Sequence, residues 1–414
     1  MTARFRPFAG AAEPDGAAYL LELAGGSLLL DCGDLRGVGW IDALPPLDTC
    51  WLGHAHLDHV RALPELKGRF PTLDVVASRP TVDLAEWTLK TRRGLDAERA
   101  AAIAAGIDSI RDRRRFEVGG TTLRPFRAGH ALGARMLHVE LPGGDGDPRG
   151  LLYTGDFCCH DQSLIWGAEF PAEGSNLSVD VLVMEGMLAT DRRADSVSYD
   201  GQRQSLSSWV GDVDGGRLIV ASPFGEAPEV VAALRSQVDS CAIHCDLVPP
   251  LEAYADHCST FSGDGWRAVE TEAAAGRLEA GGVVVAPGDR LHPGSPAAEL
   301  AREVIVRPDA GLAFVNPSEA TETPARRLRD AARGDPVDLP HGEQTLRARV
   351  DEFVLSTHAP RWGLVETVRA LSPTKTILVH GYRSRLHALR RAILERTDVD
   401  DVSVPEIGDA VAVG

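Results

Sequence analysis

Six consecutive residues constrain this chain more than any other stretch: His54-Ala55-His56-Leu57-Asp58-His59 brings together imidazoles and a carboxylate. These are the ligands that bind zinc and its neighbouring divalent metals. Residues 48–53 are largely apolar and predict a short buried strand that ends where the ligands begin. A loop leaving a strand can turn these side chains toward one point, whereas a helix would spread them around its axis. The stretch therefore predicts a metal site at a strand end.

Length and composition predict an ordinary globular protein. The chain has 414 residues, which suggests two or three domains, and it is 44% hydrophobic and 25% charged. No run of about 18 apolar residues and no N-terminal leader is evident, so we expect a cytoplasmic protein without a membrane partner. The seven cysteines lack regular spacing and predict reduced thiols. The net charge of −17 disfavours unspecific attraction to nucleic acid, but it does not exclude a local basic groove.

Further candidate ligands follow other predicted strands. A strand over 27–31 ends at Asp31, which is either a turn residue or a group that orients a ligand. Because functional loops gather at the edge of a rigid sheet, we expect these side chains to lie near the histidine-rich stretch. The other candidates at strand ends are His130, Asp156, Glu185, His358 and His380.

The pattern of elements predicts a second domain. Residues 82–92 and 97–114 have helical character. From about residue 195, strands alternate with helices, which is typical of a parallel sheet flanked by helices. After residue 345 a strand over 349–355 runs into Ser356-Thr357-His358-Ala359. We therefore divide the chain into a first part over 1–194, an inserted α/β domain over 195–345 and a return segment over 346–414.

A second set of metal-binding residue types lies within the predicted insert. It comprises Cys241, His244, Cys245, His257 and Cys258. The first three lie at or in a predicted strand and the last two in a predicted helix. Core packing is therefore favoured over an additional zinc site.

The motifs together resemble the β-CASP nuclease branch of the metallo-β-lactamase-fold hydrolases. That branch includes the pre-mRNA 3′-end cleavage endonuclease and its bacterial and archaeal ribonuclease relatives. Asp31, the histidine-rich stretch, Gly129-His130 and Tyr153-Thr154-Gly155-Asp156 match the lactamase-fold motifs. Glu185, His358 and His380 match the three β-CASP motifs. The resemblance covers nearly the whole chain and implies an αββα sandwich with an inserted β-CASP α/β domain.

The resemblance also implies a zinc-dependent phosphodiesterase that cleaves single-stranded RNA. Two Zn²⁺ per chain would be held by His54, His56, Asp58, His59, His130, Asp156 and His380, with Asp156 shared. His358 would act as general acid, oriented by Glu185. The sequence leaves open endo- against exonucleolytic cleavage, and it leaves open a homodimer.

Three alternatives remain. The first is a DNA exonuclease or repair nuclease of the same superfamily. Such nucleases usually have valine at the position of His380, so this chain resembles the RNA-cleaving nucleases more closely. A small-molecule hydrolase such as a thioesterase would not need the insert, Glu185 or His358. A non-catalytic partner subunit usually loses metal ligands, which are all present here. The chain departs from the family at Gly53, Ala134 and the insert segments 223–229 and 287–290, so the substrate-binding surface of the insert differs from the family pattern.

Overall fold

The structure is a computed structural model that describes residues 3–14, 16–33, 39–142, 149–171, 177–235, 241–261, 266–317 and 320–414. The chain divides into two compact units. Unit 1 comprises Met1–Asp161, Ile165–Asp195 and Thr357–Gly414, and unit 2 comprises Gln162–Leu164 and Ser196–Ser356. Among the described helices, none combines the length and the apolar character needed to cross a bilayer.

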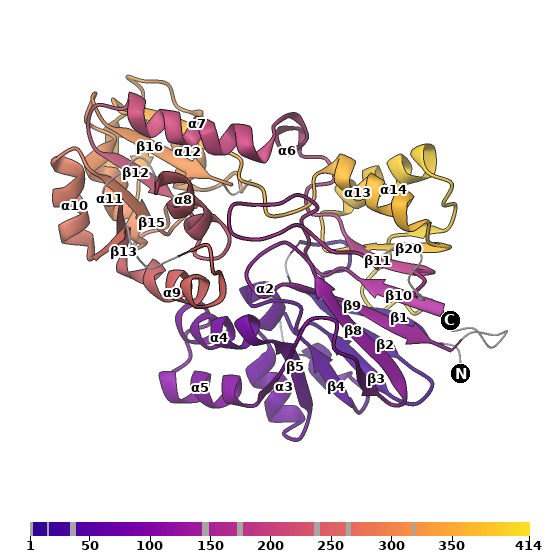
Figure 1. Ribbon diagram of the computed structural model, residues 1–414. Coiled ribbons are helices and arrows are strands. Elements are labelled where there is room, and N and C mark those ends of the chain that lie inside the picture. Colours follow the sequence, from indigo (N-terminus) through magenta and orange to yellow (C-terminus); the bar gives the residue numbers. More distant parts are fainter. Residues whose placement is uncertain are drawn as a thin grey trace. The chain divides into compact units, whose positions relative to one another are not determined.

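Unit 1 contains two sheets (Figure 1). The first runs in the order β22-β1-β2-β3-β4-β5-β6, with β1 (Arg4–Ala9), β2 (Ala18–Glu22), β3 (Ser27–Leu30), β4 (Thr49–Trp51), β5 (Asp74–Ser78), β6 (Ile107–Ile110) and β22 (Val411–Ala412). The second runs in the order β21-β20-β11-β10-β9-β8-β7, with β7 (Phe116–Val118), β8 (Thr121–Arg127), β9 (Arg135–Leu141), β10 (Arg149–Tyr153), β11 (Val181–Glu185), β20 (Lys375–Val379) and β21 (Val402–Ser403).

Strand β11 of the second sheet is apolar on both faces because each face packs against a different layer. In β11, Val181 and Val183 join a core with residues of the first sheet, such as Leu28. Their neighbour Leu182 points the other way, into a core with Leu386 of α14 (Arg383–Arg396). Successive side chains of a strand alternate between faces, so a doubly covered strand is a continuous apolar run.

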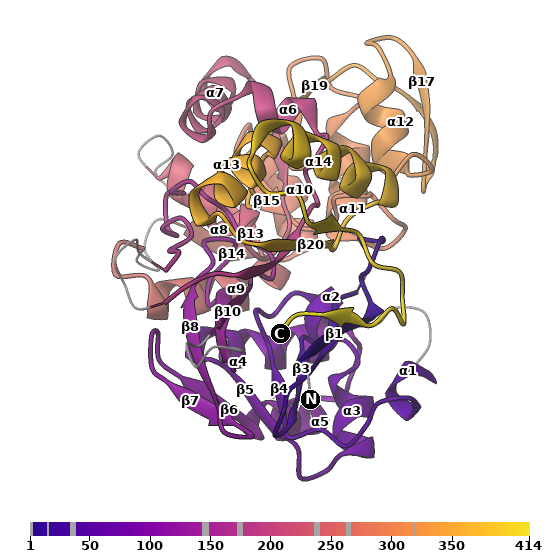
Figure 2. The ribbon, with the colours of Figure 1, turned by 90° about the vertical axis from the view of Figure 1, so that its right-hand side faces the viewer.

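Helices cover the outer face of each sheet and complete the αββα sandwich that the sequence predicted (Figures 1 and 2). Helices α4 and α5 contact β5 and β6 of the first sheet, and α14 contacts β20 and β21 of the second. The helical segments of unit 1 are α1 (Gly39–Asp42), α2 (Leu57–Val60), α3 (Leu63–Arg69), α4 (Arg79–Trp87), a π-helical turn (Thr88–Arg92), α5 (Ala97–Ala105), α13 (Arg361–Leu371) and α14. A short helix, α6 (Arg192–Ser196), precedes unit 2.

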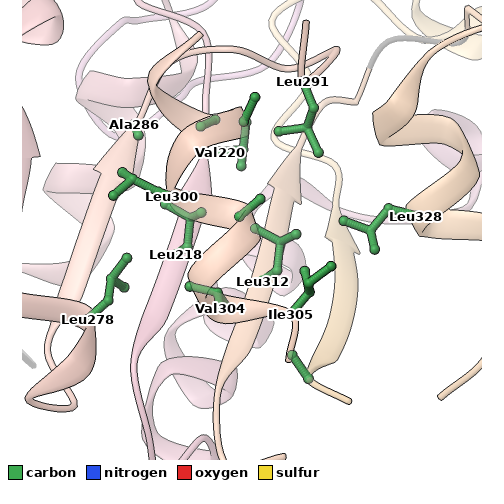
Figure 3. Packing of buried hydrophobic residues seen from close by; sticks show 14 of the residues in the cluster. Leu218, Val220, Leu278, Ala286, Leu291, Leu300, Val304, Ile305, Leu312 and Leu328 are labelled. Atoms are coloured by element: carbon green, nitrogen blue, oxygen red, sulfur yellow. The ribbon is translucent and has the colours of Figure 1, made fainter. Parts of the chain in front are cut away.

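Unit 2 is built on one parallel sheet in the order β14-β13-β15-β12-β16-β19. Its strands are β12 (Arg217–Val220), β13 (Cys241–His244), β14 (Trp266–Val269), β15 (Val283–Ala286), β16 (Gly311–Val315) and β19 (Arg349–Phe353), beside a hairpin of β17 (Pro336–Leu339) and β18 (Gly342–Thr345). The helical segments are α7 (Tyr199–Asp212), α8 (Glu226–Leu234), a 3₁₀ turn (Cys245–Leu247), α9 (Val248–His257), α10 (Thr271–Glu279), α11 (Pro296–Val304) and α12 (Pro324–Asp330). Figure 3 shows Leu300 and Val304 of α11 in the core with Leu218 and Leu312 of the sheet.

Two expectations need correction. The helix expected over 97–114 ends at Ala105, because Gly106 follows and Ile107–Ile110 forms strand β6 beside β5. The strand expected to open the return segment at residue 346 is β19, which pairs with β16 and so belongs to unit 2. The chain returns to unit 1 only at Thr357. Among the alternating elements predicted after residue 195 is a helix over 226–238. Part of that range lies outside the described residues, and α8 ends at Leu234.

Candidate metal centre

The histidine-rich stretch lies directly after β4, in unit 1. His54 and His56 occupy the connecting segment, and α2 begins at Leu57, so Asp58 and His59 lie in its first turn. The segment is therefore partly helical, rather than the continuous loop expected from the sequence. His54 and His59 are fully buried, whereas the side chain of Asp58 is 31% exposed.

A first group of side chains converges from three segments. The potential ligand atoms of His54, His56, His130 and Asp156 all lie within 4.8 Å of one another. The Nε2 of His130 lies 3.1 Å from the Nδ1 of His56, and the Nε2 atoms of His54 and His130 each lie 3.8 Å from the Oδ2 of Asp156. Three imidazoles and one carboxylate around one point form a ligand set suited to zinc.

A second group shares the same aspartate. Asp58, His59 and His380 place their potential ligand atoms within 4.8 Å of one another. The Nε2 of His59 lies 3.4 Å from Asp156 Oδ2, and the Nε2 of His380 lies 3.3 Å from Asp156 Oδ1. Asp156 therefore stands between the two groups and offers an oxygen to each. This arrangement suits a carboxylate that bridges two metal ions.

Surrounding groups fix how the histidine rings face this centre. The Nδ1 of His130 lies 2.8 Å from the carbonyl oxygen of Thr357, so Nδ1 donates a proton there and Nε2 keeps its lone pair for the centre. His380 has a left-handed backbone (φ 50°), and its N–H donates to the carbonyl of Gly10 at 2.8 Å. Such outer contacts set the tautomer and orientation of metal-binding histidines.

Asp31 orients His59 and resolves the choice that the sequence left open. It is fully buried, and its Oδ2 accepts from His59 Nδ1 at 2.9 Å and from the hydroxyl of Tyr153 at 2.6 Å. Its Oδ1 accepts from the N–H of Gly53 at 2.6 Å. Asp31 thus holds the Nε2 of His59 toward Asp156. The hydroxyl of Tyr153 was not anticipated, although the residue stands within a motif that the sequence analysis quoted.

The electrostatics separate the histidines into two sets. Burial and nearby imidazoles lower the pKa of His54 and lower the pKa values of His56 and His130 to about 3, so these rings are neutral at pH 7. Burial opposes the charged form of His59 as well, but Asp156 and Asp31 outweigh it and raise the pKa of His59. Neutral imidazole is the form that binds a metal.

Unpaired buried atoms support a metal at this centre. Within the described residues, the Nε2 atoms of His54, His59 and His380 and the Oδ1 of Asp156 are buried without a hydrogen-bond partner. Leaving buried polar atoms unsatisfied is costly, and native proteins rarely do so without a ligand, a water or an ion. These atoms belong to both groups. The donor set therefore fits metal ions at this centre.

His358 and Glu185 lie beside the first group. The Nδ1 of His358 donates to Glu185 Oε1 at 2.9 Å, and the rings of His358 and His130 have centroids 4.4 Å apart. Glu185 is held in turn by the N–H groups of Phe157 and Met187, each at 3.1 Å. Burial opposes the charged form of His358, but Glu185 outweighs it and raises the pKa of His358 to about 9. The ring is therefore protonated at neutral pH.

The fold and the site together define a metallo-β-lactamase-fold protein with a metal-binding centre at the edge of its sheets. Comparisons narrow this class. A family described as a Zn-dependent metallo-hydrolase RNA specificity domain matches residues 343–405. The cleavage and polyadenylation specificity factor subunit 3 of Dictyostelium discoideum is 23% identical over 98% of this chain and 57% of its own length. An RNase J-like protein of Methanocaldococcus jannaschii is 24% identical over 53% of this chain and 51% of its own.

Two more matches agree with these. An endoribonuclease of Kluyveromyces lactis, YSH1, is 26% identical over 56% of this chain and 32% of its own length. The crystal structure of a protein of unknown function from Enterococcus faecalis V583 superposes over both whole chains with a TM-score of 0.66 at 13% identity, which shows a shared fold. The chain thus spans about half the length of the curated relatives named here, or less. The sandwich, the candidate metal centre and these matches support the resemblance of the chain to the β-CASP branch of the metallo-β-lactamase fold.

Proposed function

We propose that the protein is a zinc-dependent phosphodiesterase that cleaves single-stranded RNA. The observation that carries the proposal is the position of Asp156 between two groups of ligands, 3.4 Å from His59 and 3.3 Å from His380. A carboxylate shared between two groups of imidazoles is the donor set of a two-metal hydrolytic centre. The names of the relatives, which refer to endoribonuclease and RNase activity, favour RNA as the substrate.

In this proposal the centre would hold two Zn²⁺. His54, His56, His130 and Asp156 would hold the first, and Asp58, His59, His380 and Asp156 the second. Such a pair supplies an activated water at neutral pH and stabilises the entering and leaving oxygens of a phosphodiester. Asp31 would keep the Nε2 of His59 aimed at the second position, since its carboxylate accepts the proton of Nδ1.

His358 would act as the general acid in this mechanism. Its Nδ1 is occupied by Glu185, which leaves the Nε2 proton for the departing oxygen of the substrate. Glu185 is 1% exposed, and two backbone N–H groups donate to its carboxylate. The carboxylate is therefore held in place and can position the ring of His358. A positioned acid contributes roughly 10²–10⁴-fold to a rate.

Two other functions are compatible with the fold but are less well supported. A DNA-cleaving nuclease would use the same centre, and only His380 and the names of the relatives argue against it. A non-catalytic subunit would share the fold, but the described ligands converge as a working centre would require. A cytoplasmic location and a homodimer remain predictions from the sequence.

The test is cleavage of end-labelled single-stranded RNA, single-stranded DNA and duplex RNA of equal sequence by zinc-loaded protein. We expect the single-stranded RNA to be cut fastest, and the product ladder distinguishes internal cleavage from cleavage at an end. Asp156→Ala, purified identically, controls for contaminating nuclease. Equal cutting of DNA would favour a repair nuclease. The proposal would be overturned if the protein cut none of the three nucleic acids but hydrolysed a small ester.

A further inference from the structure

A separate group of metal-binding side chains lies in unit 2, at one edge of its sheet. β13 ends at His244 and runs into the 3₁₀ turn that begins at Cys245, while β14 ends at Val269, just before Glu270. The two strands are parallel neighbours with His244 opposite Val269. The residues that follow the two strands therefore leave the sheet side by side, and both ends carry potential ligands.

The distances within this group match those of ligands around one ion. The Sγ of Cys245 lies 3.8 Å from His244 Nδ1, 3.9 Å from Asp246 Oδ1 and 3.1 Å from Glu270 Oε2. His244 Nδ1 lies 3.6 Å from Asp246 Oδ2. Ligands at zinc bond lengths and tetrahedral angles would be separated by roughly 3.4–3.6 Å. Shifts of a few tenths of an ångström would bring His244, Cys245 and Asp246 to these separations, and the carboxylate of Glu270, which already contacts the thiol, would turn toward them.

We propose that His244, Cys245, Asp246 and Glu270 form an additional metal site that holds one zinc ion. The thiolate selects a thiophilic metal over magnesium or calcium. Four protein ligands leave no open coordination position, so the ion would be structural and would tie the start of α9 to the end of β14. This inference does not depend on the proposed ribonuclease activity.

The His244 ring is already oriented for this role. Its Nδ1 accepts the N–H of Asp246 at 3.2 Å, so Nε2 carries the proton and donates to Thr271 Oγ1 at 3.0 Å. The N–H of Asp246 sets this tautomer, and the contact with Thr271 holds the ring in the way that outer partners hold metal-binding histidines. A metal would replace one long hydrogen bond at Nδ1. The ring itself is buried, with 4% of its surface exposed.

Charge explains why the group gains from a cation. The S–H of Cys245 donates to the carboxylate of Glu270 at 3.1 Å, and the carboxylate of Asp246 lies on the other side of the thiol at 3.9 Å. A divalent ion displaces such a proton and neutralises the thiolate and the carboxylates around it. The side chain of Asp246 is 52% exposed, which gives an ion a route from solvent.

The other residues of the sequence cluster take no part. Cys241 is buried and its Sγ lies 3.8 Å from the carbonyl oxygen of Ala242. Cys258 is buried at the end of α9, and neither it nor His257 belongs to a candidate metal group in the described part of the chain. The sequence favoured core packing for all five, because Cys241, His244 and Cys245 were expected at or in a strand and the other two in a helix. The strand ends at His244, which frees Cys245 and Asp246.

Cobalt spectroscopy provides the test. The proposed catalytic centre offers only nitrogen and oxygen ligands, so a thiolate-to-cobalt charge-transfer band in the near ultraviolet reports a cysteine ligand. The full chain, stripped of metal and reloaded with Co²⁺, should show this band at one equivalent per chain and keep it after dialysis against metal-free buffer. Cys245→Ser should abolish the band, lower zinc content by one per chain and leave RNA cleavage unchanged. Cys241→Ser is the matched control and should retain the band.

Glu270→Gln provides a second variant whose fold does not depend on the thiol. It should keep the band but weaken cobalt retention by tenfold or more. The proposal would be overturned by cobalt-loaded protein without a thiolate band, by a band that dialysis removes, or by an unchanged zinc content in Cys245→Ser. These outcomes are independent of RNA cleavage, so the two proposals fail separately.

Discussion

The carboxylate of Asp31 accepts a hydrogen bond of 2.9 Å from the Nδ1 of His59, and both side chains are fully buried. In Asp31→Asn, the NH₂ group of the asparagine would face a group that donates a hydrogen bond to Asp31 in the parent. We expect zinc affinity at the second position to fall roughly 10–100-fold, the usual loss for such outer partners. Tyr153→Phe is the control: it removes one donor to Asp31 but keeps the bond to His59, so its effect should be smaller. Zinc titration with a competing chelator measures both, and equal affinities in Asp31→Asn and the parent would contradict the assignment.

Metal removal should destabilise unit 1, because unpaired atoms of His54, His59, His380 and Asp156 would remain buried. Binding to the folded state alone adds about 2.7 kcal/mol when free metal is 100 times the dissociation constant. Chelation should therefore lower the melting temperature. Using the Cys245→Ser background isolates the centre in unit 1. Asp156→Ala should melt at nearly the same temperature with and without chelator, and a large chelator effect in that variant would place the stabilising metal elsewhere.

His358→Ala should keep its zinc and lose turnover. As a general acid, His358 should contribute roughly 10²–10⁴-fold to kcat. Glu185→Gln should lower kcat less, since the amide still offers an oxygen to His358 Nδ1. Single-turnover cleavage and elemental analysis of the same preparations measure both quantities. Loss of a zinc ion in His358→Ala would make His358 a ligand instead.

The side chain of Glu226 makes the stability of unit 2 depend on pH. Burial raises its pKa above 4.5, and hydrogen bonds from Ser222 and Asn316 offset this only in part. The folded state therefore holds the proton more tightly than the unfolded state, and this contribution is present below pH 4.5 and lost as the pH rises through the folded pKa. Glu226→Gln should gain stability over the parent as the pH rises. Asp289→Asn, which removes a nearby negative charge, should act in the same direction but less.

Urea unfolding of the parent and both variants at several pH values measures this difference. Comparing variant with parent at each pH removes the contribution of the other titrating groups. A constant difference across the range would show that Glu226 has the same pKa in both states.

Tyr199 holds the segment Gln162–Leu164 in unit 2 through Glu229. The hydroxyl of Tyr199 donates to Glu229 Oε2 at 2.5 Å, and the N–H groups of Ser163 and Leu164 donate to the same carboxylate at 2.8 and 2.9 Å. Tyr199→Phe should cost roughly 1–3 kcal/mol of unfolding free energy. Ser163→Ala keeps the backbone donor and should cost less. Denaturant unfolding checks the order, and a reversed order would contradict this account of the segment.

The residues of the candidate metal centre could be brought together from the sequence because each of them follows a strand, and the ends of packed strands meet at one edge. The helix expected over 97–114 was wrong beyond Ala105, because Ile107–Ile110 becomes a strand only through its pairing with β5. Local propensity cannot report such pairing. The predicted boundary at residue 346 differs from the structure for the same reason, because β19 belongs to unit 2 through its pairing with β16. The hydroxyl of Tyr153 and the carbonyl oxygen of Thr357 each make one hydrogen bond near the centre. The hydrophobic periodicity of the sequence does not reveal such contacts.

The sharing of Asp156 imposes an order on assembly. The first group needs only side chains up to residue 156, whereas the second must wait for His380, which arrives late in synthesis. A nascent chain can thus present one complete set of ligands long before the other exists. Its first ion would already engage the carboxylate that the second ion needs. In the proposed two-zinc centre, loading during synthesis would therefore be sequential, and a ribosome paused before residue 380 would carry ligands for the first ion alone.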